Sequence, residues 1–138
     1  MKRYMSLDIG DRTIGIAVSD LLGLTAQGVE TIRRKSLEAD LKRLSELIAE
    51  YEVEALVSGL PRNMDGTQGE RCDIVHEFMA EVAKIHPELE IHFWDERLST
   101  VAAARSLIAA DVSRRKRKKV IDKMAAVFIL QGWLDSIR

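Results

Sequence analysis

Residues 4–19, YMSLDIGDRTIGIAVS, predict two β-strands joined by a tight turn, because apolar and β-branched residues flank the turn-forming residues 10–13. Side chains alternate along a strand, so Asp8 shares a face with Ser6, and small residues such as Ala17 occupy one face of the second strand. Strands disfavour aspartate, and small neighbours leave room beside its carboxylate. Asp8 is therefore a candidate functional residue, with capping of the following turn as the structural alternative.

The composition is that of an ordinary soluble protein, with 46% apolar and 31% charged residues among 138. We expect one domain over residues 1–138, because a chain of this length can bury its own core. No apolar run approaches the ~18–20 residues of a membrane span, and the N-terminus lacks the apolar core of a signal peptide. The single cysteine, Cys72, excludes an internal disulfide framework and a multi-cysteine zinc site. These features predict a cytoplasmic protein without a membrane partner.

The rest of the chain predicts an α/β fold with the element order βββαβαβαα. Short apolar segments predict strands, and apolar stripes at helical spacing predict helices. The further strands are expected at 26–33, 55–59 and 90–94, and the helices at 37–51, 67–85 including its cap, 101–110 and 120–137. Ser36 is the expected N-cap of the first helix, and Thr67 with Glu70 fits a capping box for the second. Strands connected through helices run parallel, so we expect a mixed five-stranded sheet, three antiparallel strands followed by two parallel ones, with helices packed on it.

Two more acidic residues stand where apolar or neutral residues would be usual. Glu96 follows the strand 90–94, and pockets of parallel sheets open at the carboxyl ends of their strands. Asp122 lies on a helix that is apolar nearly all round, where an unpaired carboxylate is costly. Together with Asp8 they would supply the oxygen ligands that suit Mg²⁺ or Mn²⁺, and two such ions ~3.5–4 Å apart support phosphodiester cleavage. The structural alternatives are an ion pair of Glu96 with Arg97, and capping or ion pairing of Asp122.

Six consecutive cations precede the last expected helix, although the net charge of the chain is only −1. They are Arg114, Arg115, Lys116, Arg117, Lys118 and Lys119. Cations at a helix N-terminus oppose the helix dipole by roughly 0.3–1 kcal/mol each, so phosphate binding explains this basic run better than stability does. A solvated loop is the alternative. Arg62 and Asn63, in a turn-rich loop, are weaker candidates for contacts to phosphate or base.

Four blocks, taken in order, resemble the YqgF family, the pre-16S ribosomal RNA nucleases that are also described as Holliday junction resolvase-like. They are LDIG (residues 7–10) with IGIAV (14–18), GLPRNMDGT (59–67), DERLST (95–100), and Asp122 with its neighbours at 125 and 126. The resemblance implies a ribonuclease H-like fold. It also implies a metal-dependent nuclease, a hydrolase acting on ester bonds, in the 5′ end processing of the small-subunit ribosomal RNA precursor.

By position, the resemblance implies that Asp8, Glu96 and Asp122 are the catalytic and metal-binding acids, with Mg²⁺ or Mn²⁺ as cofactor. Related junction resolvases place a glutamate where this chain has Gly59, and three strong acids leave one or two metal ions open. The expected nucleic-acid contacts are Arg12, Arg62, Asn63, Arg97 and the six cations of the basic run. The expected partner is RNA, specifically pre-16S ribosomal RNA, with branched DNA as an open alternative, and the chain is expected to be a monomer or homodimer.

Two other classes of protein share part of the pattern. The Asp8–Gly10 segment followed by Thr13 resembles the phosphate loop of actin-like ATPases and sugar kinases, a fold that needs two such domains. A nucleic-acid-binding ribosome-assembly factor without chemistry would keep the basic run and the fold but would need no metal.

Overall fold

A computed structural model describes residues 2–98 and 114–138, the latter with side chains from residue 124 onward. Its strands are β1 (Tyr4–Ile9), β2 (Thr13–Ser19), β3 (Ala26–Arg33), β4 (Ala55–Leu60) and β5 (Glu90–Asp95). Its helices are α1 (Leu37–Glu50), α2 (Glu70–Ile85), the short 3₁₀ turn η1 (Glu96–Leu98) and α4 (Arg114–Ser136). All five expected strands are confirmed, and β4 and β5 each run one residue further than expected.

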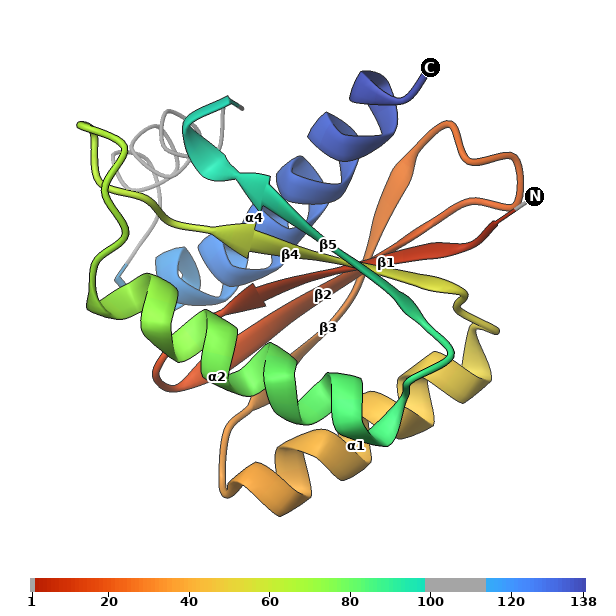
Figure 1. Ribbon diagram of the computed structural model, residues 1–138, viewed down its shortest axis with the longest axis horizontal. Coiled ribbons are helices and arrows are strands. Elements are labelled where there is room, and N and C mark those ends of the chain that lie inside the picture. The colour runs from red at the N-terminus through yellow and green to blue at the C-terminus, as the bar shows by residue number, and fades with distance from the viewer. Residues whose placement is uncertain (1, 99–113) are drawn as a thin grey trace.

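The five strands form one mixed sheet in the order β3-β2-β1-β4-β5 (Figure 1). β2 is antiparallel to β1 and β3, whereas β4 is parallel to β1 and β5. This is the sheet that the sequence predicts. Strand β1 lies at its centre, so a side chain near the end of β1 is flanked by β2 on one side and β4 on the other.

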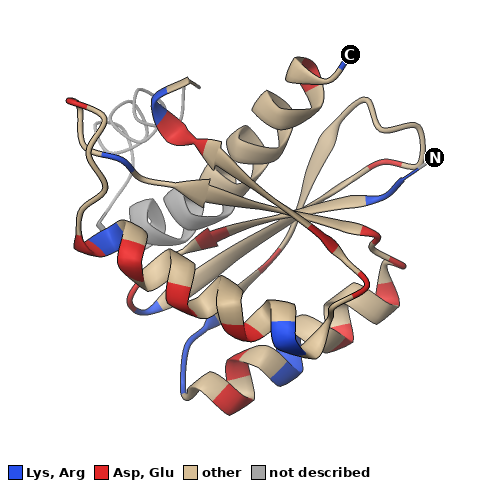
Figure 2. Cartoon of the chain, in the orientation of Figure 1, with Lys and Arg blue, Asp and Glu red and all other residues tan. Residues whose placement is uncertain are grey.

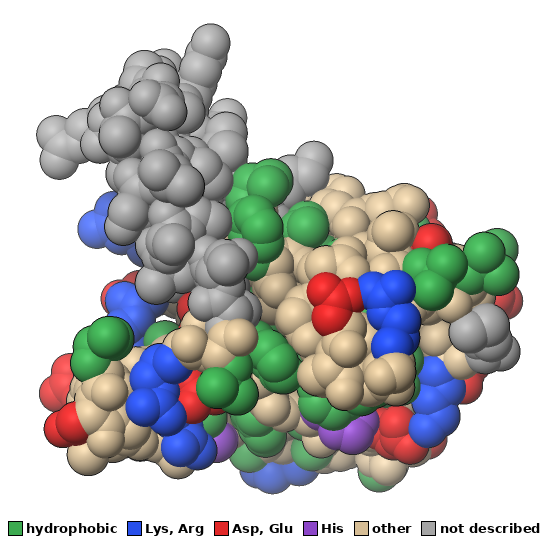
Figure 3. Space-filling view, turned by 90° about the horizontal axis from the view of Figure 1, so that it is seen from above, with side chains coloured by type: hydrophobic (Ala, Val, Ile, Leu, Met, Phe, Trp, Pro, Cys, Tyr) green, Lys and Arg blue, Asp and Glu red, His purple; other side chains and the backbone are tan. Residues whose placement is uncertain are grey.

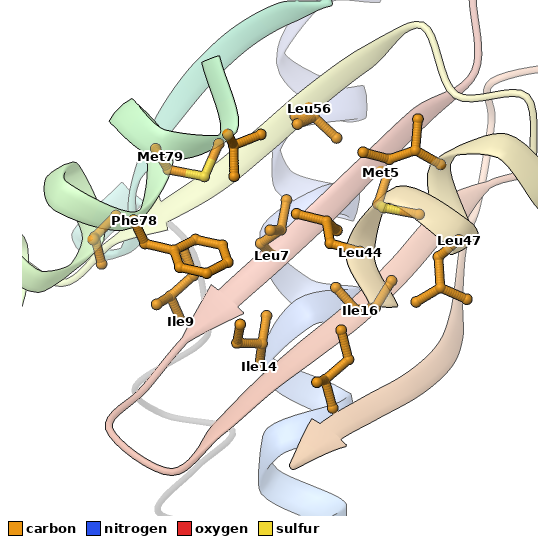
Figure 4. Packing of buried hydrophobic residues seen from close by; sticks show 14 of the residues in the cluster. Met5, Leu7, Ile9, Ile14, Ile16, Leu44, Leu47, Leu56, Phe78 and Met79 are labelled. Carbon is orange, nitrogen blue, oxygen red and sulfur yellow. The ribbon is translucent and has the colours of Figure 1, made fainter. Parts of the chain in front are cut away.

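The two faces of the sheet are covered by different helices. On one face, apolar side chains of β1 and β2 pack against α1 and α2 (Figure 4), among them Met5, Leu7, Ile14, Ile16, Leu44, Leu47, Phe78 and Met79. On the other face, Ala17 and Val57 pack against buried residues of α4, namely Ala125, Ala126, Ile129, Leu130 and Leu134. Fully burying a side chain of leucine size contributes roughly 1.5–3 kcal/mol. Met5, Leu7 and Ile9 of β1 face α1 and α2. Because side chains alternate along a strand, Ser6 and Asp8 face α4.

The N-terminal ends of two helices differ in how they are capped. Ser36 caps α1 as expected, because its side chain accepts a hydrogen bond from the backbone N–H of Ala39 at 3.1 Å. The expected capping box of α2 is wrong: the helix begins at Glu70 after Gly69, which makes no side-chain cap. The Thr67 hydroxyl donates instead to the carboxylate of Asp65, so a local turn takes the side chain that the helix would have used.

Helix α4 begins at Arg114, so the basic run lies inside this helix and not before it, contrary to expectation. Lysine and arginine are good helix formers, and this propensity outweighs the unfavourable dipole at the N-terminus. The expected helix at 101–110 lies outside the described residues. Among the helices that the structure describes, none is both long and apolar enough to cross a membrane.

Candidate active site

Asp8 stands near the carboxyl end of the central strand and is half-buried. Its partner across the antiparallel pair is Gly15, which contributes no side chain beside the carboxylate. Two residues earlier on the same face, the buried Ser6 hydroxyl donates to the Ala126 carbonyl of α4 at 2.6 Å. Asp8 therefore lies on the face covered by α4, with small neighbours, as the alternation in the sequence predicts.

Glu96 follows β5 directly, in η1, and its side chain reaches back to β4. The residue is only 7% exposed. A β-carbon added to Gly59 of β4 would stand 3.1 Å from Glu96 Oε2 and would also overlap Cδ1 of Ile129. The space above Gly59 is thus shared by a glutamate carboxylate and a helix side chain, and glycine is the residue that leaves room for both.

The strand register brings Asp8 to the same place. Leu7 pairs with Ser58 in the parallel β1–β4 ladder, and both strands continue beyond this pair, so Asp8 comes level with Gly59. Neighbouring strands are about 4.8 Å apart. Asp8 from β1 and Glu96 from the end of β5 therefore converge over Gly59 of the strand between them. Figure 2 shows the acidic residues at the carboxyl ends of β1 and β5.

Helix α4 carries the third predicted acid. Asp122 is one helical turn before Ala126, the residue whose carbonyl is held by Ser6 of β1. The side chain of Asp122 lies outside the described residues, so its place in the site stays a prediction. Among the side chains of residues 2–98 and 124–138, no three His, Cys, Asp or Glu residues are grouped to hold a metal ion. The sequence predicts that Asp122 supplies the third carboxylate beside Asp8 and Glu96.

The donor set fits a hard divalent cation. Carboxylate oxygens are the ligands that Mg²⁺ and Mn²⁺ prefer, and the described site brings two acids together over Gly59.

Arg97 is held by the aspartate two residues before it. Nη2 and Nε of Arg97 donate to the Asp95 carboxylate at 2.7 and 3.1 Å, and the backbone N–H of Arg97 donates to the same carboxylate at 3.0 Å. The hydrogen bonds from Arg97 lower the pKa of the Asp95 carboxyl, and the same pair raises the pKa of Arg97. The sequence predicts Arg97 as a nucleic-acid contact, whereas the structure places its guanidinium on a protein carboxylate.

The loop between β4 and α2 is built by its own side chains. Asp65 accepts from both the backbone N–H and the hydroxyl of Thr67, which together lower the pKa of Asp65. The Asn63 amide donates to the same Thr67 hydroxyl oxygen at 3.0 Å. Gly66 adopts a positive φ of 90°, which glycine accommodates without strain. Asn63, expected to contact nucleic acid, is exposed but takes part in the turn.

The remaining expected contacts are less constrained. Arg12 is exposed in the turn after Asp8. Arg62 is half-buried, and its Nε atom is buried with no hydrogen-bond partner. The basic run lies in the first turns of α4, with its side chains outside the described residues. On the face seen in Figure 3, the described basic side chains form separate small groups among acidic and apolar ones, so they make no continuous basic surface there.

Almost the whole chain matches a known protein family. The sequence model of RuvX, a family described as Holliday junction resolvase, matches residues 2–136. The chain belongs to the RuvX family. This confirms the resemblance to YqgF, another name for the RuvX family. Family membership covers all four sequence blocks that carried the resemblance.

Two relatives of this RuvX chain carry the name "Putative pre-16S rRNA nuclease". The one from Clostridioides difficile is 59% identical over 133 residues, which is 96% of this chain and 94% of the relative. The one from Clostridium botulinum is 57% identical over 135 residues, 98% of both chains.

Solved structures of resolvases share the fold of this RuvX chain. RuvC of Thermus thermophilus, in complex with a Holliday junction substrate, has a TM-score of 0.61 and 14% identity, covering 99% of this chain and 96% of that one. The fowlpox virus Holliday junction resolvase has a TM-score of 0.56 and 14% identity, covering 99% of both chains. The ribonuclease H-like fold expected from the sequence is thereby confirmed.

Two features of the site were not apparent in the sequence. One is the role of Asp95, the last residue of β5, as the ion-pair partner of Arg97. The other is Arg34, which joins the buried Asp40 of α1 at 3.1 Å to the carbonyl of Gly10 at 2.9 Å, directly after β1. An Arg-to-Asp spacing of this kind occurs by chance so often that it carries no signal by itself.

Proposed function

We propose that this chain is a divalent-metal-dependent nuclease that hydrolyses RNA phosphodiester bonds in the 5′ end processing of pre-16S ribosomal RNA, as a single cytoplasmic domain. The convergence of Asp8 and Glu96 over Gly59 carries the chemical part of the proposal. The choice of substrate is supported by the names of relatives that are 57% and 59% identical over almost the whole chain.

In this proposal Asp8, Glu96 and Asp122 hold Mg²⁺ or Mn²⁺. Such ions, when bound, activate a water as nucleophile and stabilise the leaving oxygen of a phosphodiester. The chain itself fixes the ligands: Asp8 is anchored on the central strand, and Glu96 is buried against Gly59 so that its carboxylate has little freedom. Ligands held in advance need less reorganisation when substrate arrives.

Positive side chains around the acids would receive the nucleic-acid backbone. Arg12 lies in the turn after Asp8, Arg62 and Asn63 lie in the loop after Gly59, and the basic run opens α4. Contacts to phosphate fix the position of a strand but read little of its sequence. We therefore expect weak base specificity from these residues.

The decisive experiment compares cleavage of a short RNA and the matching DNA in Mg²⁺ or Mn²⁺. Wild type is compared with Asp8→Asn, and with Asp11→Asn as the matched control, because Asp11 is an exposed turn acid three residues away. We expect Asp8→Asn to lose at least about 100-fold in rate and Asp11→Asn to stay near wild type, since removal of one stabilising group typically costs 10²–10³. Equal cleavage by all three proteins would contradict the assignment.

A second candidate is a nuclease for branched DNA, favoured by the description of the matching family as a Holliday junction resolvase. A four-way junction made from the matching DNA strands, added to the same assay, separates the two substrates. Faster cleavage of the junction than of the RNA would replace the RNA proposal. Salt-sensitive binding without any cleavage would indicate the non-catalytic assembly factor.

A further inference from the structure

We propose that Arg97 is a positioning residue for Glu96, and that it acts by tying the turn after β5 to the loop after β4. The inference rests on the proposed function, because Glu96 is there a metal ligand. It assigns to Arg97 a structural role within the protein, where its charge alone would suggest a contact to nucleic acid.

The first half of this tie is the Asp95–Arg97 pair. Three donors of Arg97 reach the Asp95 carboxylate: Nε, Nη2 and the backbone N–H, at 2.7 to 3.1 Å. The Asp95 side chain is 15% exposed and the Arg97 side chain is 33% exposed, so the pair is shielded more than an ordinary surface ion pair. A bidentate arginine–carboxylate pair fixes geometry as well as supplying energy.

The second half joins Arg97 to the loop. Nη1 of Arg97 donates to the Met64 carbonyl at 3.5 Å, a long contact. A β-carbon on Gly66 would stand 3.3 Å from the same Nη1, so the guanidinium lies flat against the glycine of the turn. This turn is itself fixed by the hydrogen bonds of Asp65 and Thr67. Arg97 therefore contacts a turn that has its own internal hydrogen bonds.

Glu96 lies in the sequence between the two members of the pair. Its own turn, η1, has only three residues, and so short a 3₁₀ turn has few hydrogen bonds to set its orientation. The ion pair between Asp95 and Arg97 holds the residues before and after Glu96. It thereby orients the backbone of Glu96, whose side chain extends to Gly59. Partners that orient a ligand in this way typically affect metal affinity 10–100-fold when removed.

Arg62 provides the contrast within the same site. It lies in the same loop, where its backbone N–H donates to the Leu60 carbonyl at 2.9 Å, but its side-chain Nε atom is buried without a hydrogen-bond partner among the described residues. A guanidinium in this state remains available to a phosphate, whereas that of Arg97 is already engaged. The two arginines are thus matched in chemistry and opposite in expected role.

The test measures metal binding and nucleic-acid binding separately on Arg97→Gln, Asp95→Asn and Arg62→Gln. Mn²⁺ affinity is followed by electron paramagnetic resonance of free Mn²⁺ in the absence of nucleic acid. RNA affinity is followed by fluorescence anisotropy in EDTA over a range of salt concentrations. Arg97→Lys, which keeps the charge but loses the bidentate geometry, and thermal unfolding of each variant show whether an effect comes from charge or from misfolding.

We expect Arg97→Gln and Asp95→Asn to weaken Mn²⁺ binding about 10-fold or more while the dependence of RNA affinity on salt is unchanged. Arg62→Gln should leave Mn²⁺ binding near wild type and flatten the salt slope by about 0.7, the value for one phosphate contact on a single strand. Arg97→Lys should behave like Arg97→Gln toward Mn²⁺.

Two outcomes would overturn the inference, and they are distinct from a failure of the nuclease. If Arg97→Gln flattens the salt slope and leaves Mn²⁺ affinity intact, Arg97 is a phosphate contact; Asp95→Asn should then bind RNA more tightly, because it frees the guanidinium. If Mn²⁺ affinity and salt slope are both unchanged, Arg97 has no positioning role. If Asp8→Asn binds Mn²⁺ as tightly as wild type does, the proposed nuclease itself is refuted.

Discussion

Glu96 Oε2 lies 3.1 Å from the position that a β-carbon on Gly59 would occupy. The acid after β5 thus fills the space over the end of β4, at the level of Asp8 on β1. The site therefore needs both Glu96, which follows β5, and a residue without a side chain at position 59 of β4. Any side chain at position 59 would compete with the glutamate for this space.

Gly59→Ala tests this competition. The added methyl group would collide with Ile129 Cδ1 and crowd Glu96, so we expect a loss of about 1–3 kcal/mol in the free energy of unfolding and weaker Mn²⁺ binding. The double variant with Ile129→Val removes the Cδ1 collision and should recover part of the stability without recovering Mn²⁺ affinity. Urea unfolding and Mn²⁺ titration of both proteins check this. Full recovery of both quantities would show that the glycine serves helix packing alone.

Asp40→Ala tests the link between α1 and the turn after Asp8. Asp40 is buried and accepts from Arg34 Nε at 3.1 Å and from the Lys35 backbone at 3.0 Å. Removing one partner of a buried ion pair leaves the other uncompensated, so we expect about 3 kcal/mol lower stability in urea unfolding. Glu46→Gln, which breaks an exposed ion pair of the same helix, should cost less than about 0.5 kcal/mol. Similar losses in both variants would contradict this assignment.

The Asp95–Arg97 pair predicts a stability change at acid pH. The pKa of Asp95 is lower in the folded protein than in the unfolded chain, where it is about 3.9. A lowered carboxyl pKa contributes stability that is complete above the unfolded pKa and is lost as the pH falls through the folded pKa. The stability difference between wild type and Asp95→Asn should therefore be constant from pH 5 to 8 and shrink below about pH 4. Urea unfolding at several pH values measures it, and a difference that changes between pH 6 and 8 would point to another group.

Replacing the six cations of the basic run with glutamine tests what the run contributes. If each contacts one phosphate of a single strand, the plot of log affinity against log salt should flatten by about 4. The same variant should be slightly more stable, because cations at the N-terminus of α4 oppose its dipole. Anisotropy titrations and thermal unfolding measure the two effects. An unchanged salt slope would exclude the run from nucleic-acid binding.

Much of the fold could be predicted from local pattern. The alternation in residues 4–19 places Asp8 on the face opposite Leu7, and the structure agrees. The two errors at helix starts have local causes. Thr67 bonds to Asp65 because a turn offers a nearer partner than a helix, and the basic run is helical because propensity exceeds dipole repulsion. Both decisions depend on small energy differences between two reasonable conformations.

The site was less accessible to sequence reasoning. Asp8 and Glu96 stand out by residue type, but their convergence depends on the register of Leu7 with Ser58, which no local pattern specifies. Arg97 shows the converse limit. An exposed arginine beside acids suits phosphate binding and internal pairing equally well, and its ion pair with Asp95 and its contact with Gly66 become visible only in three dimensions.

Helix α4 follows every strand of the sheet in the chain, and this order has a consequence for synthesis. A growing polypeptide emerges at about 5–20 residues per second, so the sheet with α1 and α2 can form while the face bearing Ser6, Ala17 and Val57 is still bare. Chains interrupted before α4 would expose this apolar face and would be prone to aggregation. They would also lack Asp122, so under the proposed mechanism cleavage would begin only after α4 has docked.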